Sequence, residues 1–97
     1  MIHNPPHPGE ILRQDIIAPL GLSVAEAADR IAMSRVALSR VLNCNAGISP
    51  DLAVRLEQAG ASTAQAWMTM QANYDLWQAL QRQQPPVRPL AFPAGMH

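Results

Sequence analysis

The sequence predicts a single all-α domain of five helices, followed by a short proline-rich tail. Apolar residues recur every three or four positions over most of residues 1–82, which is the helical period. Serine or threonine stands where most of these segments begin, and proline or glycine interrupts the chain between them. At 97 residues the chain is long enough for one core of this kind and too short for two.

The first predicted helix spans residues 8–18 and follows a proline-rich arm, Met1 to His7. Pro8 suits the first position of a helix, and the Glu10 carboxylate suits the positive N-terminal end of the helix dipole. Pro19 ends the segment. The residues expected to face inward are Leu12, Ile16 and, as a third candidate, Ile17.

Residues 23–31 and 34–43 are predicted to form two short helices joined by a tight turn. Ser23 caps the first helix, and Glu26, three residues later, completes a capping box. Ser34 caps the second helix. The residues expected to face inward are Val24, Ala27, Ala28 and Ile31 in the first helix and Leu38, Val41 and Leu42 in the second.

The opposite face of the second of these helices is polar and basic, since it carries Arg35, Val36, Ser39 and Arg40. An α-helix fits the major groove of DNA, where arginine can bind both acceptors of guanine and serine can bind a base or a phosphate. The pair therefore has the layout of a helix-turn-helix and indicates DNA binding. Short amphipathic helices with solvated arginines are also common in all-α proteins, so this pattern needs further support.

The charge distribution supplies part of that support. The formal net charge is zero and the chain contains no lysine, which is unusual for a nucleic-acid binder because non-specific affinity comes mainly from neutralised phosphates. However, the stretch from Arg30 to Pro50 contains three arginines and no acidic residue. The positive charge is concentrated on the predicted DNA-reading helix. We therefore expect modest non-specific affinity and a dimer that reads two half-sites.

Two further helices are predicted over residues 50–59 and 63–82. Ser49 and Pro50 mark the start of the first, Gly60 marks its end, and Gly47 in the preceding loop is expected to need a positive φ angle. The last helix carries an unusually bulky stripe, Trp67, Met70, Tyr74, Trp77 and Leu80. We expect this stripe to form a homodimer or partner interface; the alternative, strongest for Trp67, is that the rings close the core.

The remaining features limit the classes of function. The tail, residues 83–97, is expected to be a disordered end, or else an extended segment that docks through Leu90 and Phe92. The single cysteine, Cys44, excludes an internal disulfide and Cys-based zinc patterns. No apolar run is long enough to span a membrane and the start does not resemble a signal peptide, so we expect a cytoplasmic protein.

An enzymatic function is the weakest alternative. The candidate acid/base or metal cluster consists of His3, His7, Glu10 and Asp15, but no later residues converge on it. We expect no catalytic residues, no metal and no cofactor.

Five segments together resemble the HigA-type antitoxins of HigBA toxin–antitoxin systems, within the lambda-repressor-like, Xre-type group of helix-turn-helix proteins. The segments are HPGEIL at 7–12, APLGLS at 18–23, the helix-turn-helix, GIS at 47–49 and AWMTMQANYDLW at 66–77. The resemblance covers about residues 2–81. It implies a five-helix lambda-repressor-like domain that dimerises, binds double-stranded operator DNA, represses its own operon and neutralises a RelE-like mRNA-cleaving toxin by forming a complex.

The resemblance also implies the residues of the DNA site. Those expected to face bases or nearby phosphates are Ser34, Arg35, Val36, Ser39 and Arg40, and those expected to meet the DNA backbone are Asn43 and Asn45. The chain departs from the family pattern at four positions, one of which is Asn45 in place of a phosphate-binding lysine. Val24 replaces a phosphate-binding glutamine, Ala32 replaces the turn glycine and is tolerable only at negative φ, and Cys44 replaces a loop glycine.

Two alternatives to the antitoxin function stay open. The first is a stand-alone Xre-type repressor without a toxin. The second is a protein-interaction module that has kept the fold and lost DNA binding.

Overall fold

In the computed structural model, residues 4–91 are described, and they form the all-α fold that the sequence predicts. The elements are α1 (Pro8–Ile11), η1 (Leu12–Ile17), α2 (Val24–Arg30), α3 (Arg35–Leu42), α4 (Pro50–Gln58) and α5 (Ala64–Gln81). Because α1 runs directly into η1, these elements make five helical segments within the described residues. Each segment begins and ends within one residue of its predicted bounds.

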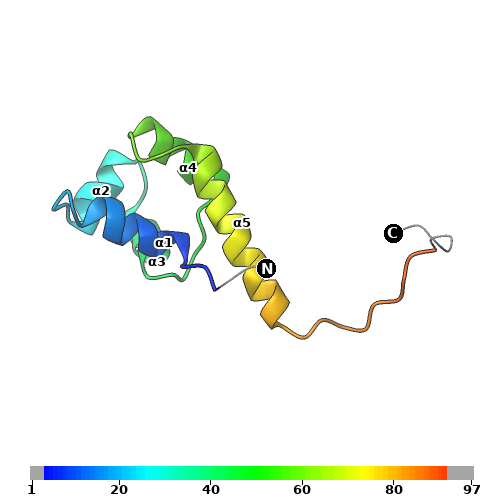
Figure 1. The fold of residues 1–97 in the computed structure, drawn as a ribbon. Coiled ribbons are helices and arrows are strands. Elements are labelled where there is room, and N and C mark those ends of the chain that lie inside the picture. The colour runs from blue at the N-terminus through cyan, green and yellow to red at the C-terminus, as the bar shows by residue number, and fades with distance from the viewer. Residues whose placement is uncertain (1–3, 92–97) are drawn as a thin grey trace.

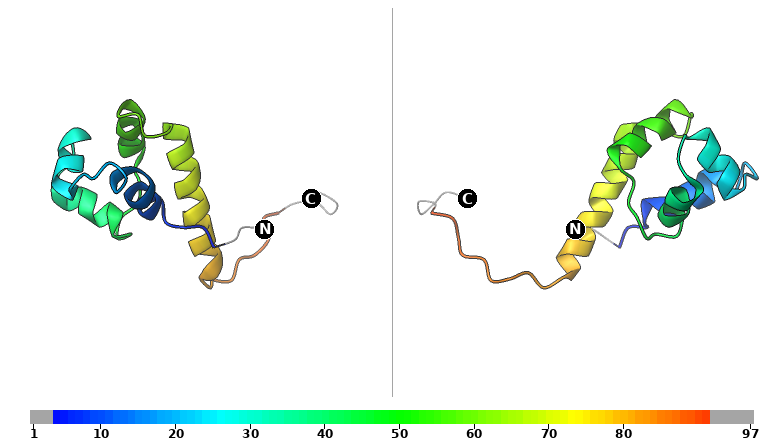
Figure 2. Two further views of the ribbon diagram at one scale, coloured as in Figure 1. Left: turned by 60° about the vertical axis from the view of Figure 1, so that its left-hand side comes forward. Right: turned by 180° about the vertical axis from the view of Figure 1, so that it is seen from behind.

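The first four segments form a compact body, and α5 begins beside α4 and runs past α1 (Figure 1). Residues 82–91, which follow α5, extend away from this body in all three ribbon views (Figure 1 and Figure 2). Residues 83–90 have no regular secondary structure, and the Leu90 side chain is exposed. The predicted anchor Phe92 lies outside the described residues, as does His3.

The helix starts follow from local capping signals. The Ser23 hydroxyl accepts the Glu26 N–H at 3.1 Å, and the Glu26 carboxylate accepts the Ser23 N–H at 3.1 Å, which completes the predicted capping box. These hydrogen bonds hold the pKa of Glu26 below its usual value. Side chains also cap the other three α-helices that follow in the described chain, through Ser34, Ser49 and Thr63.

The first helical segment differs from the prediction of one regular α-helix. From Leu12 to Ile17 the backbone is a π-helix, and the Ala18 N–H donates to the Arg13 carbonyl, five residues back, at 2.9 Å. Residues five apart point in different directions on a regular α-helix. The wider π turn allows both Leu12 and Ile17 to be buried in the core.

The core fills the space between the helices of the body. Its buried apolar residues are Leu12, Ile17, Ala27, Ala28, Ile31, Leu38, Val41, Leu42, Ile48, Leu52, Ala53, Leu56, Ala61 and Trp67. Trp67 is only 1% exposed, and its indole N–H donates to the Ala61 carbonyl at 2.6 Å. This corrects the sequence interpretation of Trp67, because a ring sealed inside the monomer core is not available for a dimer interface.

Helices α1, α3 and α5 meet at a contact that we call the N-terminal clasp, formed by His7, Gly9, Val41 and Tyr74. The His7 Nδ1 atom accepts the Gly9 N–H at 2.9 Å and caps α1. The His7 ring also packs edge-on against Tyr74, with 4.7 Å between ring centroids. A Cβ atom on Gly9 would collide with the Val41 carbonyl oxygen. The clasp therefore fixes α3 against α1 at backbone contact distance.

A second polar contact fastens the loop before α4 to α5. The buried Gln71 side chain accepts the Ile48 N–H at 2.7 Å and donates to Asp75 at 2.9 Å. The predicted reason for Gly47 is wrong, because the positive-φ glycines of the described chain are Gly21 and Gly60. A Cβ atom on Gly47 would instead lie 3.0 Å from the Gln71 amide, so glycine leaves room there for the close approach of that side chain.

Candidate nucleic-acid interface

The surface predicted to bind DNA is the outer face of α3. The inner face of this helix is buried through Leu38, Val41 and Leu42, and α3 packs against α2 and α1. The Ser34 hydroxyl accepts the Ala37 N–H at 3.0 Å, which fixes the start of the helix. With its inner face and its first turn fixed, α3 presents its other face to solvent in one orientation.

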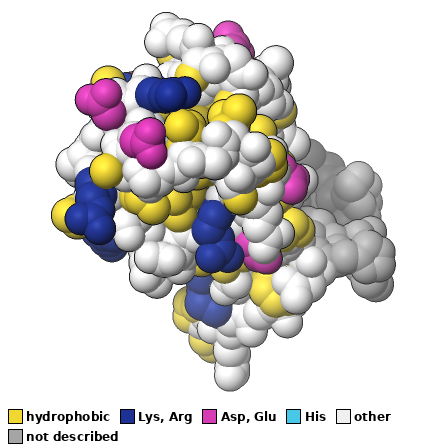
Figure 3. All heavy atoms as spheres, turned by 90° about the vertical axis from the view of Figure 1, so that its left-hand side faces the viewer, with side chains coloured by type: hydrophobic (Ala, Val, Ile, Leu, Met, Phe, Trp, Pro, Cys, Tyr) yellow, Lys and Arg dark blue, Asp and Glu magenta, His cyan; other side chains and the backbone are white. Residues whose placement is uncertain are grey.

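The exposed face of α3 carries the predicted residues together. Arg35, Val36, Ser39 and Arg40 line one shallow hollow in its surface. All are exposed except Ser39, which is half-buried. Figure 3 views the molecule from the side of the α1, α2 and α3 body and shows basic side chains, which in this chain are arginines, spread around an apolar area.

Two side-chain hydrogen bonds, in addition to those of the backbone, tie the loop after α3 to this face. The Arg40 guanidinium donates to the Asn45 carbonyl at 3.3 Å, and the Asn43 amide donates to the Ser39 hydroxyl at 3.3 Å. The residues predicted from the resemblance therefore form one continuous surface. Because Ser39 accepts from Asn43, its own hydroxyl hydrogen is left to donate to another group.

The backbone on both sides of α3 adopts the left-handed conformation that favours glycine. Ala32, in the turn before α3, has φ +54°, and Cys44, in the loop after it, has φ +63°. The expectation that alanine at position 32 requires a negative φ is therefore wrong. The Arg55 side chain of α4 donates to the Ala32 carbonyl at 2.8 Å and holds the turn in place. Such a conformation costs a non-glycine residue about 1–2 kcal/mol.

The sequence analysis missed the residues that support the site from a distance. Arg55 lies 23 residues from the carbonyl that it binds, and Gln71 lies 23 residues from Ile48. No local pattern marks such pairs. The His7 cap had one local signal, a polar side chain directly before Pro8 at a helix start.

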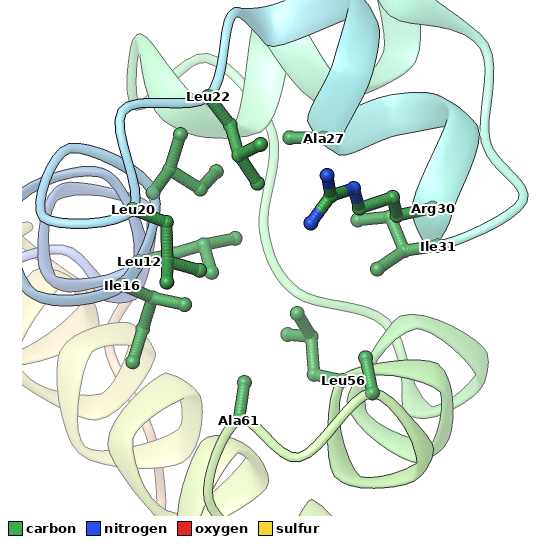
Figure 4. A pocket seen from close by; sticks show the side chains of 11 residues that line it. Leu12, Ile16, Leu20, Leu22, Ala27, Arg30, Ile31, Leu56 and Ala61 are labelled. Carbon is green, nitrogen blue, oxygen red and sulfur yellow. The ribbon is translucent and has the colours of Figure 1, made fainter.

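A separate pocket lies between η1, α2 and α4 and shares no residue with the hollow on α3 (Figure 4). Its lining is apolar except for the guanidinium of Arg30. The described residues that line it include no carboxylate, imidazole, thiol or hydroxyl group. The pocket therefore contains no acid/base pair or nucleophile for catalysis.

Residues 4–91 lack the features of two other classes of protein. No group of three or more His, Cys, Asp or Glu side chains there is arranged to hold a metal ion. None of the helices in that range combines the length and the apolar character needed to cross a membrane.

Comparison with known proteins gives a consistent set of relatives, although no family model matches the chain. Virulence-associated protein A of Dichelobacter nodosus is 45% identical over 74 residues, which are 75% of this chain and 72% of that protein. The Pseudomonas aeruginosa antitoxin HigA, solved with the higBA promoter, is 36% identical, with a TM-score of 0.74 and 77% and 82% of the two chains covered. Antitoxin GraA is 33% identical, with a TM-score of 0.77 over 81% and 85% of the two chains.

The packed pair α2 and α3, the exposed basic face of α3 and these similarities define the class of the protein, a helix-turn-helix regulator of the DNA-binding type. Similarity to several HigA antitoxins, which extends over most of both chains, narrows the class further. The chain belongs to the HigA-type antitoxin family of lambda-repressor-like proteins. The family and the all-α fold predicted from the sequence are thus confirmed.

Proposed function

We propose that the chain is an antitoxin that binds its own operator as a homodimer, represses its operon and neutralises a RelE-like toxin by forming a complex. The observation that carries the DNA part is the exposed face of α3, where Arg35, Val36, Ser39 and Arg40 surround one hollow in an acid-free stretch of the chain. Relatives solved with a promoter or an operator support DNA binding by the chain. The proposed activity is binding, without catalysis, and belongs in the cytoplasm, where the DNA and the toxin's target are found.

The proposed dimer face is the outer stripe of α5, without Trp67. Leu80 is 63% exposed and Leu76 is 49% exposed, although both are large and apolar. Met70, Tyr74 and Trp77 are half-buried along the same helix. A second copy packed on this stripe would cover apolar surface and pair two α3 helices for a two-fold symmetric operator.

The test of the DNA site is Arg40→Ala, measured by fluorescence anisotropy on the chain's own promoter at low and moderate salt. Loss of a bidentate contact to guanine in each half-site should weaken specific binding by at least about tenfold and leave the fold intact. Arg82→Ala is the matched control, because Arg82 is an exposed arginine beyond the end of α5.

Each outcome of this test has a separate meaning. Unchanged affinity of Arg40→Ala would reject the role of Arg40. If the wild-type protein binds its own promoter no more strongly than it binds scrambled DNA, operator binding itself is rejected. The alternative of a protein-interaction module that has lost DNA binding is then favoured.

A second experiment tests the toxin part of the proposal by co-expressing the chain with a neighbouring reading frame of toxin size. An antitoxin should co-purify with the small basic protein encoded there and relieve the growth arrest that this protein causes. A stand-alone repressor would do neither.

A further inference from the structure

Val36 is an apolar residue within the polar, basic face of α3. Its side chain is 72% exposed, more than any other large apolar side chain on the helices of the described chain. Burial therefore contributes little to keeping valine at this position. Helix formation does not favour it either, because β-branched residues lose side-chain freedom in a helix.

The surroundings of Val36 restrict what it could contact. Arg35 precedes it, and Ser39 and Arg40 lie one turn further along the same face, three and four residues on. No carboxylate or amide side chain occurs between Ser34 and Leu42. Helix α3 itself therefore lacks the usual partners of adenine and of the cytosine amino group, and the nearest amide, that of Asn43, donates to Ser39. Ala37 and Ser39 are small, so the helix can approach a surface closely enough for a short valine side chain to touch it.

We propose that Val36 reads the 5-methyl group of a thymine in each operator half-site, next to the guanine bound by an arginine of the same face. This proposal rests on the proposed insertion of α3 into the major groove. The thymine methyl is the apolar feature of the base edges in that groove, and valine offers two methyl groups to it. A cytosine at this position would place its amino group against the valine side chain, which cannot accept a hydrogen bond, and would be disfavoured.

The experiment removes that methyl group and changes nothing else. Each thymine of one half-site, with its symmetry mate, is replaced in turn by 2′-deoxyuridine in the chain's own promoter duplex. Wild-type protein and Val36→Ala are then titrated by fluorescence anisotropy. We expect one thymine pair at which deoxyuridine weakens wild-type binding by about threefold to tenfold, as expected for loss of apolar contacts. Val36→Ala should bind the natural duplex more weakly and be insensitive to deoxyuridine at that pair.

Val54→Ala is the matched control, because Val54 is also an exposed helical valine, 47% exposed, but lies on α4. It should retain the full sensitivity to deoxyuridine. Specific wild-type binding without any sensitive thymine, or a Val36→Ala protein that remains sensitive, would overturn the role of Val36 and leave operator binding standing. Absence of specific wild-type binding would instead overturn the proposed function, and the inference with it. Because alanine forms helices better than valine, Val36→Ala is expected to fold.

Discussion

In the N-terminal clasp, glycine stands where a side chain would collide, whereas at the two ends of α3 alanine and cysteine stand where the backbone favours glycine. Gly9 faces the Val41 carbonyl across the clasp, and the obstacle is backbone that cannot rotate away. Ala32 and Cys44 have positive φ on an exposed edge, where strain is the only cost. The clasp therefore excludes any side chain at position 9, whereas the exposed edge accepts side chains at a cost in backbone strain.

The clasp sets the position of α3 relative to the rest of the body, whereas the exposed edge sets only the turn and the loop beside it. The polar groups of the clasp are also paired, since His7 Nδ1 accepts the Gly9 N–H. Within residues 4–91, every buried side-chain nitrogen or oxygen has a hydrogen-bond partner. Strain is placed instead at the turn, where Arg55 from α4 holds the Ala32 carbonyl. Because the exposed Ser62, before α5, also has a positive φ of +64°, we infer that the chain tolerates such strain at exposed positions and not in the clasp.

The largest effect is expected from Gly9→Ala. Alanine would favour the helix by about 1 kcal/mol on propensity alone. The added Cβ atom would nevertheless collide with the Val41 carbonyl oxygen and force α1 away from α3. We expect the free energy of unfolding to fall by about 3 kcal/mol, at the upper end of overpacking effects. Urea denaturation followed by circular dichroism measures this change.

Gly21→Ala separates collision from backbone strain. Gly21 has φ +67° with open space around it, so alanine there meets strain but no neighbouring atom. Its expected cost is about 1 kcal/mol. Equal losses in the two variants would show that the clasp is not a steric constraint.

A smaller effect of opposite sign is expected at the exposed edge. Ala32→Gly should raise the free energy of unfolding by about 0.5–1 kcal/mol, because glycine adopts φ +54° without strain and this gain exceeds the entropy it adds to the unfolded chain. Ala59→Gly is the matched control. Ala59 ends α4 at φ −81°, so glycine there should destabilise the protein. Destabilisation by Ala32→Gly would mean that alanine is not strained in the turn.

How much the sequence could predict depended on the range over which each interaction acts. Helix bounds were predictable because capping by Ser23, Ser34 and Ser49 acts over three residues. The π turn was not, since its hydrogen bonds satisfy the same donors as an α-helix. The roles of Gly47 and Gln71 were not predictable either, because they depend on a contact between segments 23 residues apart.

In the candidate site, too, short-range features could be predicted from the sequence and long-range contacts could not. The outward face of α3 follows from its period, so Arg35, Val36, Ser39 and Arg40 could be predicted to lie together, and their role in binding DNA stays a prediction. The burial of Trp67 in the core could not be deduced from its spacing alone. The same period places it in line with Met70 and Tyr74, and the loop carbonyl of Ala61 that accepts its indole N–H becomes its neighbour only in the folded chain.

The smallest expected effect is a pH dependence of the free energy of unfolding, which should arise in the clasp and not at the exposed edge. Burial lowers the pKa of His7 below 6.5, and the nearby carboxylates of Asp75 and Glu10 oppose this only in part. Folded His7 therefore binds a proton more weakly than unfolded His7, so the free energy of unfolding should decrease as the pH falls from 6.5 through the folded pKa. Protonation of His7 Nδ1 would also break the hydrogen bond that this atom accepts from the Gly9 N–H. His7→Asn keeps a capping acceptor that does not titrate in this range, so the pH dependence of its unfolding should be shallower. Urea unfolding of both proteins between pH 7.5 and about 5 measures this difference in pH dependence. The contributions of the other histidines are the same in both proteins and cancel in the comparison. Parallel pH profiles would show that His7 does not couple the clasp to protonation.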